Sequence, residues 1–388
     1  MKICIISSNY PSEGLPLNVF VEQLVNELML QSIDIEVIAP QSVTRALFRH
    51  GALLPYLDYR IIGGRQYKVW RPYYVSLGNC SGWLHRILEK IRFRGIKKII
   101  DSMRVKPDVL YGHFWQSAYV VKNYALKHRL PLFVACGEGD NALENLVSFI
   151  STTEKRELVS AVTGVISVST ENKRKCVEYG LAKSENIIVL PNSVDISLFD
   201  SSKGVNKRNE INVKDNDFLI AFIGSFIHRK GSARLAAAID MLDDPQIKVM
   251  YIGKEQPGDD ATPHCKGIVF KGCLNHQLIP DYLKSADIFC LPTLNEGCSN
   301  AIVEALSCGL PVISSNKPFN YDVLDESNSL LIEPMNVEEI AQAIKKLKED
   351  VILRKKLSEG AMKKANLLRL DVRVAKIINF IKSYTISE

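Results

Sequence analysis

Two glutamates, Glu296 and Glu304, are the side chains most suited to chemistry in this sequence, because seven residues separate them across the start of a predicted helix. A strand is followed by a short polar loop, and the helix begins near Ser299 or Asn300. The first backbone N–H groups of such a helix favour negative charge, so residues 297–300 would face a diphosphate. Glu304 could then accept both hydroxyls of a ribose, while Glu296 would point towards the group attached to the diphosphate.

The same spacing also fits a loop glutamate followed by a helix glutamate at the surface. Three neighbouring features favour a binding site instead: a proline before the loop, a glycine after Glu296, and the Gly-x-Pro-Val turn into the next strand at 309–312. The loop residues predicted to contact the bound group are Gly297, Cys298, Ser299 and Asn300.

Two adjacent cations, Arg229 and Lys230, lie between a predicted strand that ends at Gly224 and a helix that opens at Gly231. Cations and a helix N-terminus would converge on one point, which suits a pyrophosphate leaving group that gains negative charge during a reaction. Gly224 and Ser225 belong to the same predicted site. The alternative is that both cations are ordinary surface residues, and the expected proximity of the two glutamates argues against it.

In the first half of the chain, four residues near predicted strand ends could bind a second substrate. Gly14, in the loop after the first strand, would permit a close approach of the backbone. His113 ends another strand, and Glu138 and Asp140 alternate with glycines in the loop 136–140, an arrangement suited to sugar hydroxyls. His113 could equally have a structural role, and Asp140 could cap the helix that follows.

Apolar strand-like runs alternate with helix-period segments along the whole chain, which is typical of parallel sheets covered by helices on both faces. The helix predicted at 17–30 carries its apolar residues on one face, namely Val21, Leu24, Val25 and Leu28. A polar stretch at 200–217 divides the pattern into two halves. The sequence therefore predicts an α/β protein with two Rossmann-like domains, 1–199 and 200–370, and a C-terminal helix at about 371–388 that packs back on the first.

Composition excludes several other classes of protein. The chain has 388 residues, and its longest apolar runs of five to seven residues are far shorter than the about 20 that a spanning helix needs. The N-terminus turns polar too early for a signal peptide, so a cytoplasmic protein is expected. Nine cysteines without a Cys-x-x-Cys pair indicate reduced thiols and no zinc site. The one Asp-x-Asp pattern, Asp215 to Asp217, is predicted to form a turn, so neither a metal nor another cofactor is expected.

Positive charge is concentrated at residues 41–107, which hold fourteen Lys and Arg against three Asp and Glu, although the net charge of the chain is only +6. A helix in this window mixes apolar residues with cations such as Arg86, Lys90 and Arg94, which suits an anionic membrane surface. A helix with a core-facing stripe and a cationic solvent face explains the pattern equally well. The sequence has none of the common nucleic-acid-binding motifs, such as zinc fingers or basic leucine zippers, so no nucleic acid is expected as a partner.

The segment 292–315 resembles the donor site of the family 4 retaining glycosyltransferases, in which two glutamates are separated by seven residues. The resemblance extends over nearly the whole chain: residues 189–199 are similar to the hinge motif of that family, 222–231 to its phosphate clamp, and 317–334 to the segment after its donor site. Ser193 replaces the usual glycine of the hinge motif, and Ser225 stands where the clamp usually has an arginine, a charge that Arg229 could supply. The resemblance implies the GT-B fold, with the parallel sheets of two Rossmann-like domains facing across a cleft.

The activity implied by this resemblance is a metal-independent, retaining hexosyltransferase of bacterial polysaccharide biosynthesis. Arg229 and Lys230 would hold the diphosphate of a UDP- or GDP-sugar, Glu304 its ribose and Glu296 the transferred sugar. The acceptor would be a glycan, lipid-linked at the inner face of the plasma membrane, and would approach from the first domain. Two alternatives stay open: a nucleotide-sugar epimerase of the same fold, and a non-catalytic protein that binds sugar nucleotides.

Overall fold

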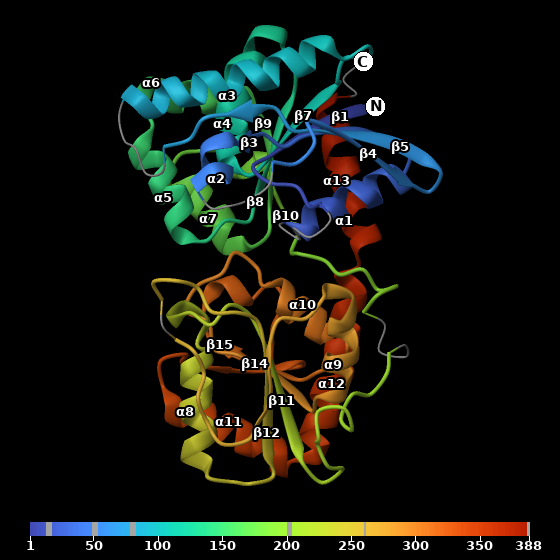
Figure 1. Ribbon diagram of the computed structural model, residues 1–388, viewed down its shortest axis with the longest axis vertical. Helices are drawn as coiled ribbons and strands as arrows, with labels where there is room; N and C mark the ends of the chain where they lie inside the picture. The colour runs from blue at the N-terminus through green and yellow to red at the C-terminus, as the bar shows by residue number, and fades with distance from the viewer. Residues whose placement is uncertain (13–17, 49–52, 78–82, 200–203, 260, 386–388) are drawn as a thin grey trace. The chain divides into compact units, whose positions relative to one another are not determined.

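The computed structural model describes residues 1–388 except 13–17, 49–52, 78–82, 200–203, 260 and 386–388. The chain forms two compact units (Figure 1): unit 1 contains Met1–Leu190 and Arg373–Glu388, and unit 2 contains Pro191–Val372. Each unit is an α/β structure built on a mainly parallel sheet, which confirms the predicted fold class.

The strand order of unit 1 reverses at its centre. The sheet has eight strands in the order β10-β9-β8-β7-β1-β2-β5-β4. The strands are β1 (Lys2–Ser7), β2 (Asp34–Ile38), β4 (Leu57–Ile62), β5 (Arg65–Trp70), β7 (Val109–His113), β8 (Leu132–Cys136), β9 (Val162–Ser167) and β10 (Ile187–Val189). Because β1 is paired with both β2 and β7, successive connections run in opposite directions from this point. Ligands of open α/β sheets bind at the carboxyl ends of the strands at such a reversal, here after Ser7 and His113.

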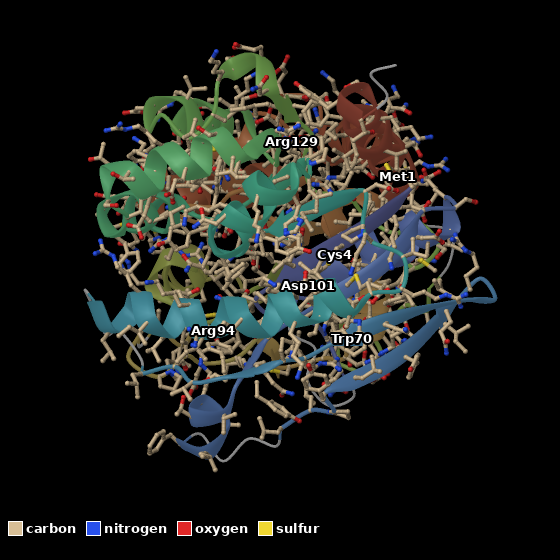
Figure 2. The ribbon with its side chains drawn as sticks, turned by 90° about the horizontal axis from the view of Figure 1, so that it is seen from above. Met1, Cys4, Trp70, Arg94, Asp101 and Arg129 are labelled. Carbon is tan, nitrogen blue, oxygen red and sulfur yellow. The ribbon has the colours of Figure 1, made fainter. Side chains whose placement is uncertain are left out.

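The window 41–77 contains structure that the sequence analysis did not predict. β4 is antiparallel to β5, and the two strands are joined by Gly63 and Gly64, whose φ angles of 54° and 73° suit a tight hairpin turn. A second, short pair consists of β3 (Gln41–Ser42) and β6 (Tyr73–Tyr74), and helix α2 (Val43–Phe48) follows β3 directly. β6 packs against helix α3 (Trp83–Ser102), on which Arg94 and Asp101 are labelled (Figure 2). The extended run of basic residues is thus divided among several elements.

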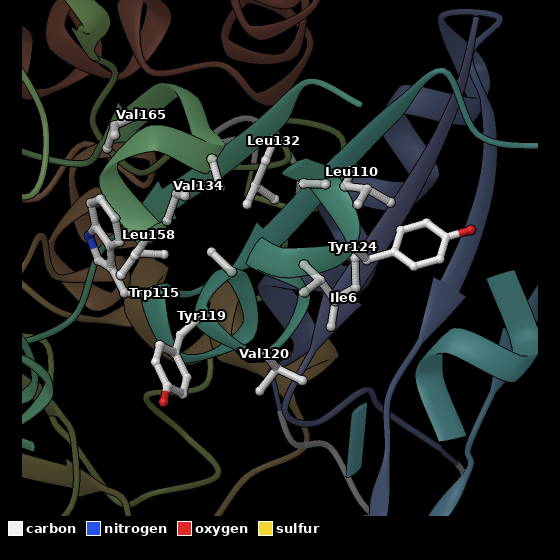
Figure 3. Packing of buried hydrophobic residues seen from close by; sticks show 14 of the residues in the cluster. Ile6, Leu110, Trp115, Tyr119, Val120, Tyr124, Leu132, Val134, Leu158 and Val165 are labelled. Carbon is white, nitrogen blue, oxygen red and sulfur yellow. The ribbon is translucent and has the colours of Figure 1, made fainter. Parts of the chain in front are cut away.

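Helices hold their positions on the sheet of unit 1 through buried apolar faces. One cluster joins the strands to α3, α4 (Trp115–His128), α5 (Asp140–Phe149), α6 (Thr152–Ala161) and α7 (Thr170–Glu178), and Trp115 is 1% exposed within it (Figure 3). Helix α1 (Val19–Leu30) buries the four residues predicted for its inner face, and Met29 in addition. Burying one such side chain contributes about 1.5–3 kcal/mol, so rotating any of these helices to expose its buried face would be costly.

The sheet of unit 2 has six parallel strands in the order β13-β12-β11-β14-β15-β16, which is a Rossmann order. The strands are β11 (Phe218–Ile223), β12 (Ile247–Ile252), β13 (Ile268–Gly272), β14 (Ile288–Leu291), β15 (Val312–Ser315) and β16 (Ser329–Ile332). The order reverses between β11 and β14. A ligand is therefore expected at the loops that follow Ile223 and Leu291.

Two pairs of helices pack on each other in unit 2. α8 (Ser232–Leu242) packs on α11 (Val337–Glu349), and α10 (Asn300–Ser307) packs on α12 (Val351–Leu367), while the short α9 (Ile279–Ser285) leads into β14. No helix in the described part of the chain is both long and apolar enough to cross a membrane.

The division of the chain falls nearer its N-terminus than the predicted boundary at 199. Residues 191–199 belong to unit 2, because Asn192 Nδ2 donates to the carbonyl oxygen of Cys298 (2.8 Å) and Ser307 Oγ donates to that of Phe199 (2.9 Å). At the other end the chain leaves unit 2 after Val372, within α13 (Leu370–Thr385). The remainder of this last helix belongs to unit 1.

We predict that Gly360→Ala destabilises unit 2, although alanine normally stabilises a helix interior relative to glycine by about 1 kcal/mol. Gly360 lies in α12, and a Cβ atom there would be 1.9 Å from the carbonyl oxygen of Ser327. Relieving this overlap should lower the free energy of unfolding by about 1–3 kcal/mol, measured by urea denaturation. Glu359→Ala, at the exposed neighbouring position, is the control and should change stability little. A Gly360→Ala protein at least as stable as the wild type would contradict this packing.

Candidate active site

The loops after β11 and β14 are hydrogen-bonded to each other at the reversal of strand order. The backbone N–H of Leu294 donates to the carbonyl oxygen of Arg229 (2.8 Å), and Thr293 Oγ1 lies 3.3 Å from the same oxygen. The segment that carries Arg229 and Lys230 is therefore fixed against the segment that carries Glu296. The sheet brings together residues that are far apart in the sequence.

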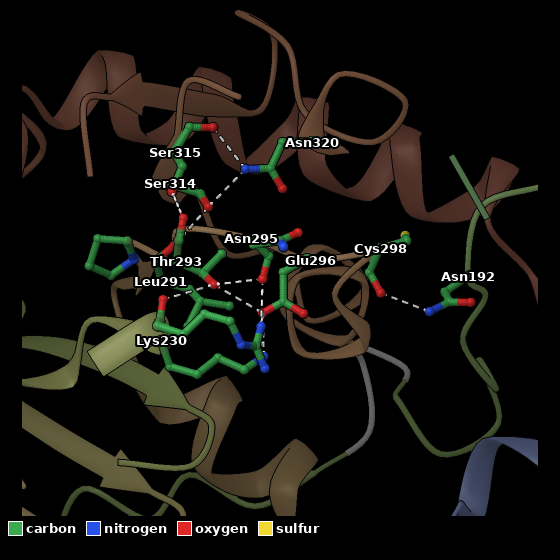
Figure 4. Close-up of polar contacts among 12 residues, drawn as sticks. Asn192, Lys230, Leu291, Thr293, Asn295, Glu296, Cys298, Ser314, Ser315 and Asn320 are labelled. Carbon is green, nitrogen blue, oxygen red and sulfur yellow. Dashed lines mark hydrogen bonds and ion pairs between the residues drawn. The ribbon is translucent and has the colours of Figure 1, made fainter. Parts of the chain in front are cut away.

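Glu296 is the centre of a charged cluster (Figure 4). Its Oε1 atom accepts hydrogen bonds from Lys230 Nζ, from Arg229 Nη1 (3.1 Å) and from Thr293 Oγ1 (3.0 Å). The side chains of Lys230 and Glu296 are 17% and 12% exposed, whereas that of Arg229 is 44% exposed. Water and salt screen a partly buried pair less than an exposed one, so Lys230 is the principal partner of Glu296.

Buried side chains on β15 and just after it support the end of β14 (Figure 4). Ser314 Oγ donates to the carbonyl oxygen of Leu291 (2.8 Å), and Ser315 Oγ donates to that of Thr293. Asn320 Nδ2 donates in turn to the carbonyl oxygen of Ser315 (2.8 Å). Ser314 and Ser315 did not stand out in the sequence, because serines at the end of a strand carry no spacing signal. They fix the loop from which Glu296 projects.

Glycines are required where the backbones of this site approach most closely. Gly231 has a φ of 79°, and a Cβ atom there would lie 2.5 Å from the carbonyl oxygen of Pro292. A Cβ atom on Gly253, which follows β12, would lie 1.9 Å from the carbonyl oxygen of Gly224. Neither position has room for a side chain, so the backbone at Gly231 packs directly on that at Pro292, and the backbone at Gly253 on that at Gly224.

Glu304 lies in the second turn of α10 and has a partner that sequence reasoning missed. Its Oε1 atom is 2.9 Å from Nε2 of His276, in the short helix η3 (His276–Leu278), and the ring of His276 packs edge-on against Phe199. Burial lowers the pKa of His276, but the hydrogen bond and charge of Glu304, together with the charge of Asp195, raise it above its ordinary value overall. The hydrogen bond with His276 holds the carboxylate of Glu304 in one orientation. A single histidine in a polar loop, 28 residues from its partner, gives no pattern by which to find it.

The loop between the two glutamates has the predicted position. Gly297, Cys298 and Ser299 are buried, Asn300 is the first residue of α10, and Ser299 is its N-cap. In the loop after β11, Gly224 and Ser225 are half-buried. The predicted donor-site residues therefore lie in the segments that follow two adjacent strands, β11 and β14. Their contact with a donor stays a prediction.

The structure does not describe Gly14 or the side chain of Asp140, two of the four predicted acceptor residues. Gly14 lies outside the described residues. Asp140 is the first residue of α5, where Gly139 is the N-cap, and its side chain also lies outside the description.

His113 ends β7, at the strand-order reversal of unit 1. It is 6% exposed and is surrounded by the rings of Phe20, Tyr111 and Phe114. Burial, and then the positive charge of Arg373, lower the pKa of His113 to about 3, so its imidazole is neutral at physiological pH. Its Nδ1 atom has no hydrogen-bond partner within the described structure. Arg373, a cation on α13 that the sequence analysis did not single out, thus acts on the carboxyl end of the first sheet.

Glu138 has a structural role that the sequence did not indicate. Its carboxylate accepts hydrogen bonds from the backbone N–H groups of Trp115 (2.8 Å) and Gly137 (3.1 Å), so it caps the start of α4 from another loop. Burial raises the pKa of Glu138 to about 7, and these backbone hydrogen bonds offset only part of that rise. Binding of an acceptor by Glu138 stays a prediction.

The Asp-x-Asp pattern forms a turn. Asp217 Oδ2 accepts a hydrogen bond from the backbone N–H of Lys214 (2.8 Å), and the backbone N–H of Asp217 donates to the carbonyl oxygen of Lys214 (3.1 Å). The side chain of Asp217 is therefore used within its own loop. In the described part of the chain, no three His, Cys, Asp or Glu side chains are grouped as metal ligands.

Comparisons with known proteins agree with the geometry of unit 2. Residues 205–364 match the family described as Glycosyl transferases group 1, a range that includes the charged cluster and Glu304. The same range contains all six strands of the second sheet.

Relatives and solved structures cover more of the chain. The putative teichuronic acid biosynthesis glycosyltransferase TuaC of Bacillus subtilis is 25% identical over 92% of each chain. An Escherichia coli enzyme, UDP-Gal:alpha-D-GlcNAc-diphosphoundecaprenol alpha-1,3-galactosyltransferase, is 28% identical over 55% of this chain and 59% of its own length. The sucrose-phosphate synthase of Thermosynechococcus elongatus superposes over 100% of both chains with a TM-score of 0.76 and 16% identity. HepE of Anabaena in complex with UDP-glucose covers 99% of this chain and 100% of its own, with a TM-score of 0.71 and 16% identity. The chain has the GT-B fold.

The raised pKa of Glu138 predicts a specific pH dependence of stability. Its pKa is about 7 in the folded protein, against an ordinary value of 4.5, so the folded state binds this proton more tightly than the unfolded state. The stability from this proton is full below pH 4.5 and is lost as the pH rises through 7. Between these limits we expect the wild type to lose up to about 3 kcal/mol relative to Glu138→Gln, measured by urea denaturation at several pH values. Parallel stability curves for the two proteins would contradict the prediction.

Proposed function

We propose that the chain is a retaining glycosyltransferase that moves a hexose from a UDP- or GDP-sugar to a glycan acceptor in bacterial polysaccharide biosynthesis. The observation that carries this proposal is the cluster of Lys230, Arg229 and Glu296, with Glu304 on the following helix, at the strand-order reversal of a group 1 domain. The names of the B. subtilis and E. coli relatives, one acting in teichuronic acid biosynthesis and the other on a diphosphoundecaprenol-linked sugar, support an acceptor of this kind. A lipid-linked acceptor would place the reaction at the inner face of the plasma membrane.

Donor binding would use charges that are already in place. Lys230 and Arg229 share one carboxylate oxygen of Glu296, so the cations lie beside the loop that leads into α10 before a donor arrives. A diphosphate placed there would take over part of this positive charge and would also face the N-terminus of α10. Glu296 would then be released to accept a hydroxyl of the donor sugar.

Glu304 would bind the ribose of the donor. A carboxylate can accept both vicinal hydroxyls when it is ionised and held in one orientation. The hydrogen bond with His276 holds the carboxylate of Glu304 in one orientation. His276 would therefore be a positioning residue that acts through Glu304.

The chemical step would need neither a metal nor a side-chain nucleophile. Glu296 is held by three donors through Oε1, which makes it poorly suited to attack the anomeric carbon. The acceptor hydroxyl would attack that carbon from the face of the leaving diphosphate, and its proton would pass to a phosphate oxygen as the bond from carbon to phosphate oxygen breaks. Lys230 and Arg229 would stabilise the charge that develops on the diphosphate. This course preserves the anomeric configuration.

Two other functions predict different products. An epimerase of the same fold would convert the nucleotide sugar into its epimer without any acceptor. A non-catalytic binding protein would bind a donor in calorimetry but give no product with any acceptor. The intact charged cluster argues against the non-catalytic function, and incubation with the donor alone separates the epimerase from the transferase.

We predict that Lys230→Ala lowers kcat/KM for transfer on the order of 10²–10³-fold, because the leaving diphosphate loses its least exposed cation. Glu304→Ala should lower the affinity for the donor about 10–100-fold and abolish any preference for ribose over 2′-deoxyribose in the nucleotide. Initial rates and calorimetry with ribo- and 2′-deoxynucleotides measure these effects. Lys266→Ala, which removes an exposed lysine paired with Asp243, is the control and should behave as the wild type. Turnover near that of the wild type in either site variant would refute the donor site.

Transfer should proceed at an unchanged rate in EDTA, because the cations of the site replace a metal. NMR of the first product should show the same anomeric configuration as the donor sugar. A requirement for a divalent cation would contradict the proposed role of Arg229 and Lys230. Inversion of configuration would contradict attack from the leaving-group face.

A further inference from the structure

Strand β4 forms one edge of the sheet of unit 1 (Figure 1). It is the last strand in the order β10-β9-β8-β7-β1-β2-β5-β4, and among the described residues no strand pairs with its other side. β4 contains six residues and no proline. An edge strand presents a row of unpaired backbone N–H and C=O groups, to which another strand can bind.

The pairing of β4 with β5 fixes which backbone groups of β4 point outwards. Just before β4, the carbonyl oxygen of Tyr56 accepts a hydrogen bond from the backbone N–H of Arg71 (2.7 Å). In an antiparallel ladder every second residue makes such bonds to the neighbouring strand, so the even-numbered residues of β4 bond to β5. The backbone groups of the odd-numbered residues therefore point away from the sheet, namely those of Leu57, Tyr59 and Ile61.

The odd-numbered residues of β4 also have apolar side chains on one face of the strand. Successive side chains of a strand alternate between its two faces, so Leu57, Tyr59 and Ile61 share a face. Tyr59 is 51% exposed and Ile61 is 72% exposed. Natural edge strands are commonly protected by proline, by a bulge or by charged side chains. This face of β4 has none of these.

The even-numbered residues place balanced charges on the opposite face of β4. Arg60 pairs with Asp58 (2.9 Å) and with Glu22 on α1 (3.7 Å), and Asp58 also contacts the buried Arg71 (3.5 Å). These two acids and two bases sum to zero, so two copies of the edge could meet without an excess of like charge. The side chains of Asp58 and Arg60 are 28% and 31% exposed, which leaves them accessible to a further partner.

We propose that β4 pairs with β4 of a second copy of this chain, antiparallel about a two-fold axis at Tyr59. Leu57 then lies opposite Ile61 of the second copy, and the outward backbone groups form hydrogen-bonded pairs. On the other face, Asp58 lies opposite Arg60 of the second copy. Cross-strand pairs of apolar side chains and of opposite charges both stabilise a sheet. Because the axis makes one patch bind itself, each of these contacts occurs twice.

The charges of β4 favour this register over its neighbours. An axis at Arg60 would bring two arginines opposite each other, and an axis at Asp58 would do the same with two aspartates. Like charges directly opposite each other destabilise a sheet. An axis between two adjacent residues would pair a residue whose backbone groups point outwards with one whose groups bond to β5. A second copy fits better than an unrelated strand, because β4 is complementary to itself.

Sedimentation of the full chain over a range of concentrations tests the proposed dimer. The wild type should associate to a dimer. Tyr59→Pro removes the N–H at the axis without removing a bond to β5, because that N–H points outwards. It should lower the association constant at least about tenfold, since the hydrogen bond is lost twice in each interface. Tyr59→Phe, which keeps the N–H and the ring, is the matched control and should dimerise like the wild type.

Cysteine substitutions test the register. Two residues paired at the axis have Cα atoms about 5.5 Å apart, which is within reach of a disulfide. Tyr59→Cys should therefore give a covalent dimer on oxidation with diamide, seen on a non-reducing gel. In Ile61→Cys the two introduced thiols would be about 14 Å apart along the strands, too far to join. Its cross-linking should not exceed that of the wild type, in which the exposed Cys273 sets the background.

These experiments do not depend on the proposed function, because no changed residue lies in the donor site. A wild type that stays monomeric at every concentration would overturn the proposal and leave the edge to a strand of another protein. A dimer that Tyr59→Pro leaves unchanged would also overturn it. If Tyr59→Pro does not fold, the cysteine variants decide: a Tyr59→Cys protein that cross-links no more than Ile61→Cys would contradict the pairing.

Discussion

The Lys230–Glu296 ion pair is the interaction on which the candidate site depends. It joins the loop after β11 to the loop after β14, which are adjacent only because the strand order of unit 2 reverses between these strands. The rest of the local structure holds the two ends of this pair in place. Gly231 and Gly253 let backbones approach without a side chain between them, and Ser314 and Ser315 fix the end of β14.

An ion pair of this kind prepares a site for an anion. Without Glu296, the ammonium of Lys230 would lose its acceptor in a half-buried position, and its side chain would be free to adopt other rotamers. Glu296 keeps the ammonium oriented until a diphosphate arrives. His276 and Glu304 form a similar pair, in which the histidine ring orients the carboxylate of the donor-site residue. In both cases a residue of the proposed donor site is held by a partner of opposite charge on another loop.

Much of the fold could be predicted from the sequence, because buried parallel strands and amphipathic helices leave strong periodic patterns. Glu296, Glu304 and Lys230 could be found because each lies next to a strand end or helix start that the sequence marks. His276, Arg373 and the support by Ser314 and Ser315 could not, since their roles depend on contacts between segments distant in the chain. The hairpin at 57–70 does leave a signal in the sequence, because Gly63-Gly64 lies between two alternating runs. The boundary after Leu190 depends on the hydrogen bonds of Asn192 with the loop before α10 and of Phe199 with Ser307 on α10, which no pattern within 189–199 reveals.

The most direct test of this account is a crystal structure of the chain with a bound nucleoside diphosphate, prepared in EDTA. We expect phosphate oxygens within hydrogen-bond distance of Lys230 Nζ and of the first backbone N–H groups of α10, with both ribose hydroxyls on the carboxylate of Glu304. Glu296 should have given up at least one of its two cations. A diphosphate bound elsewhere, or a ribose with no contact to Glu304, would contradict the proposed donor site.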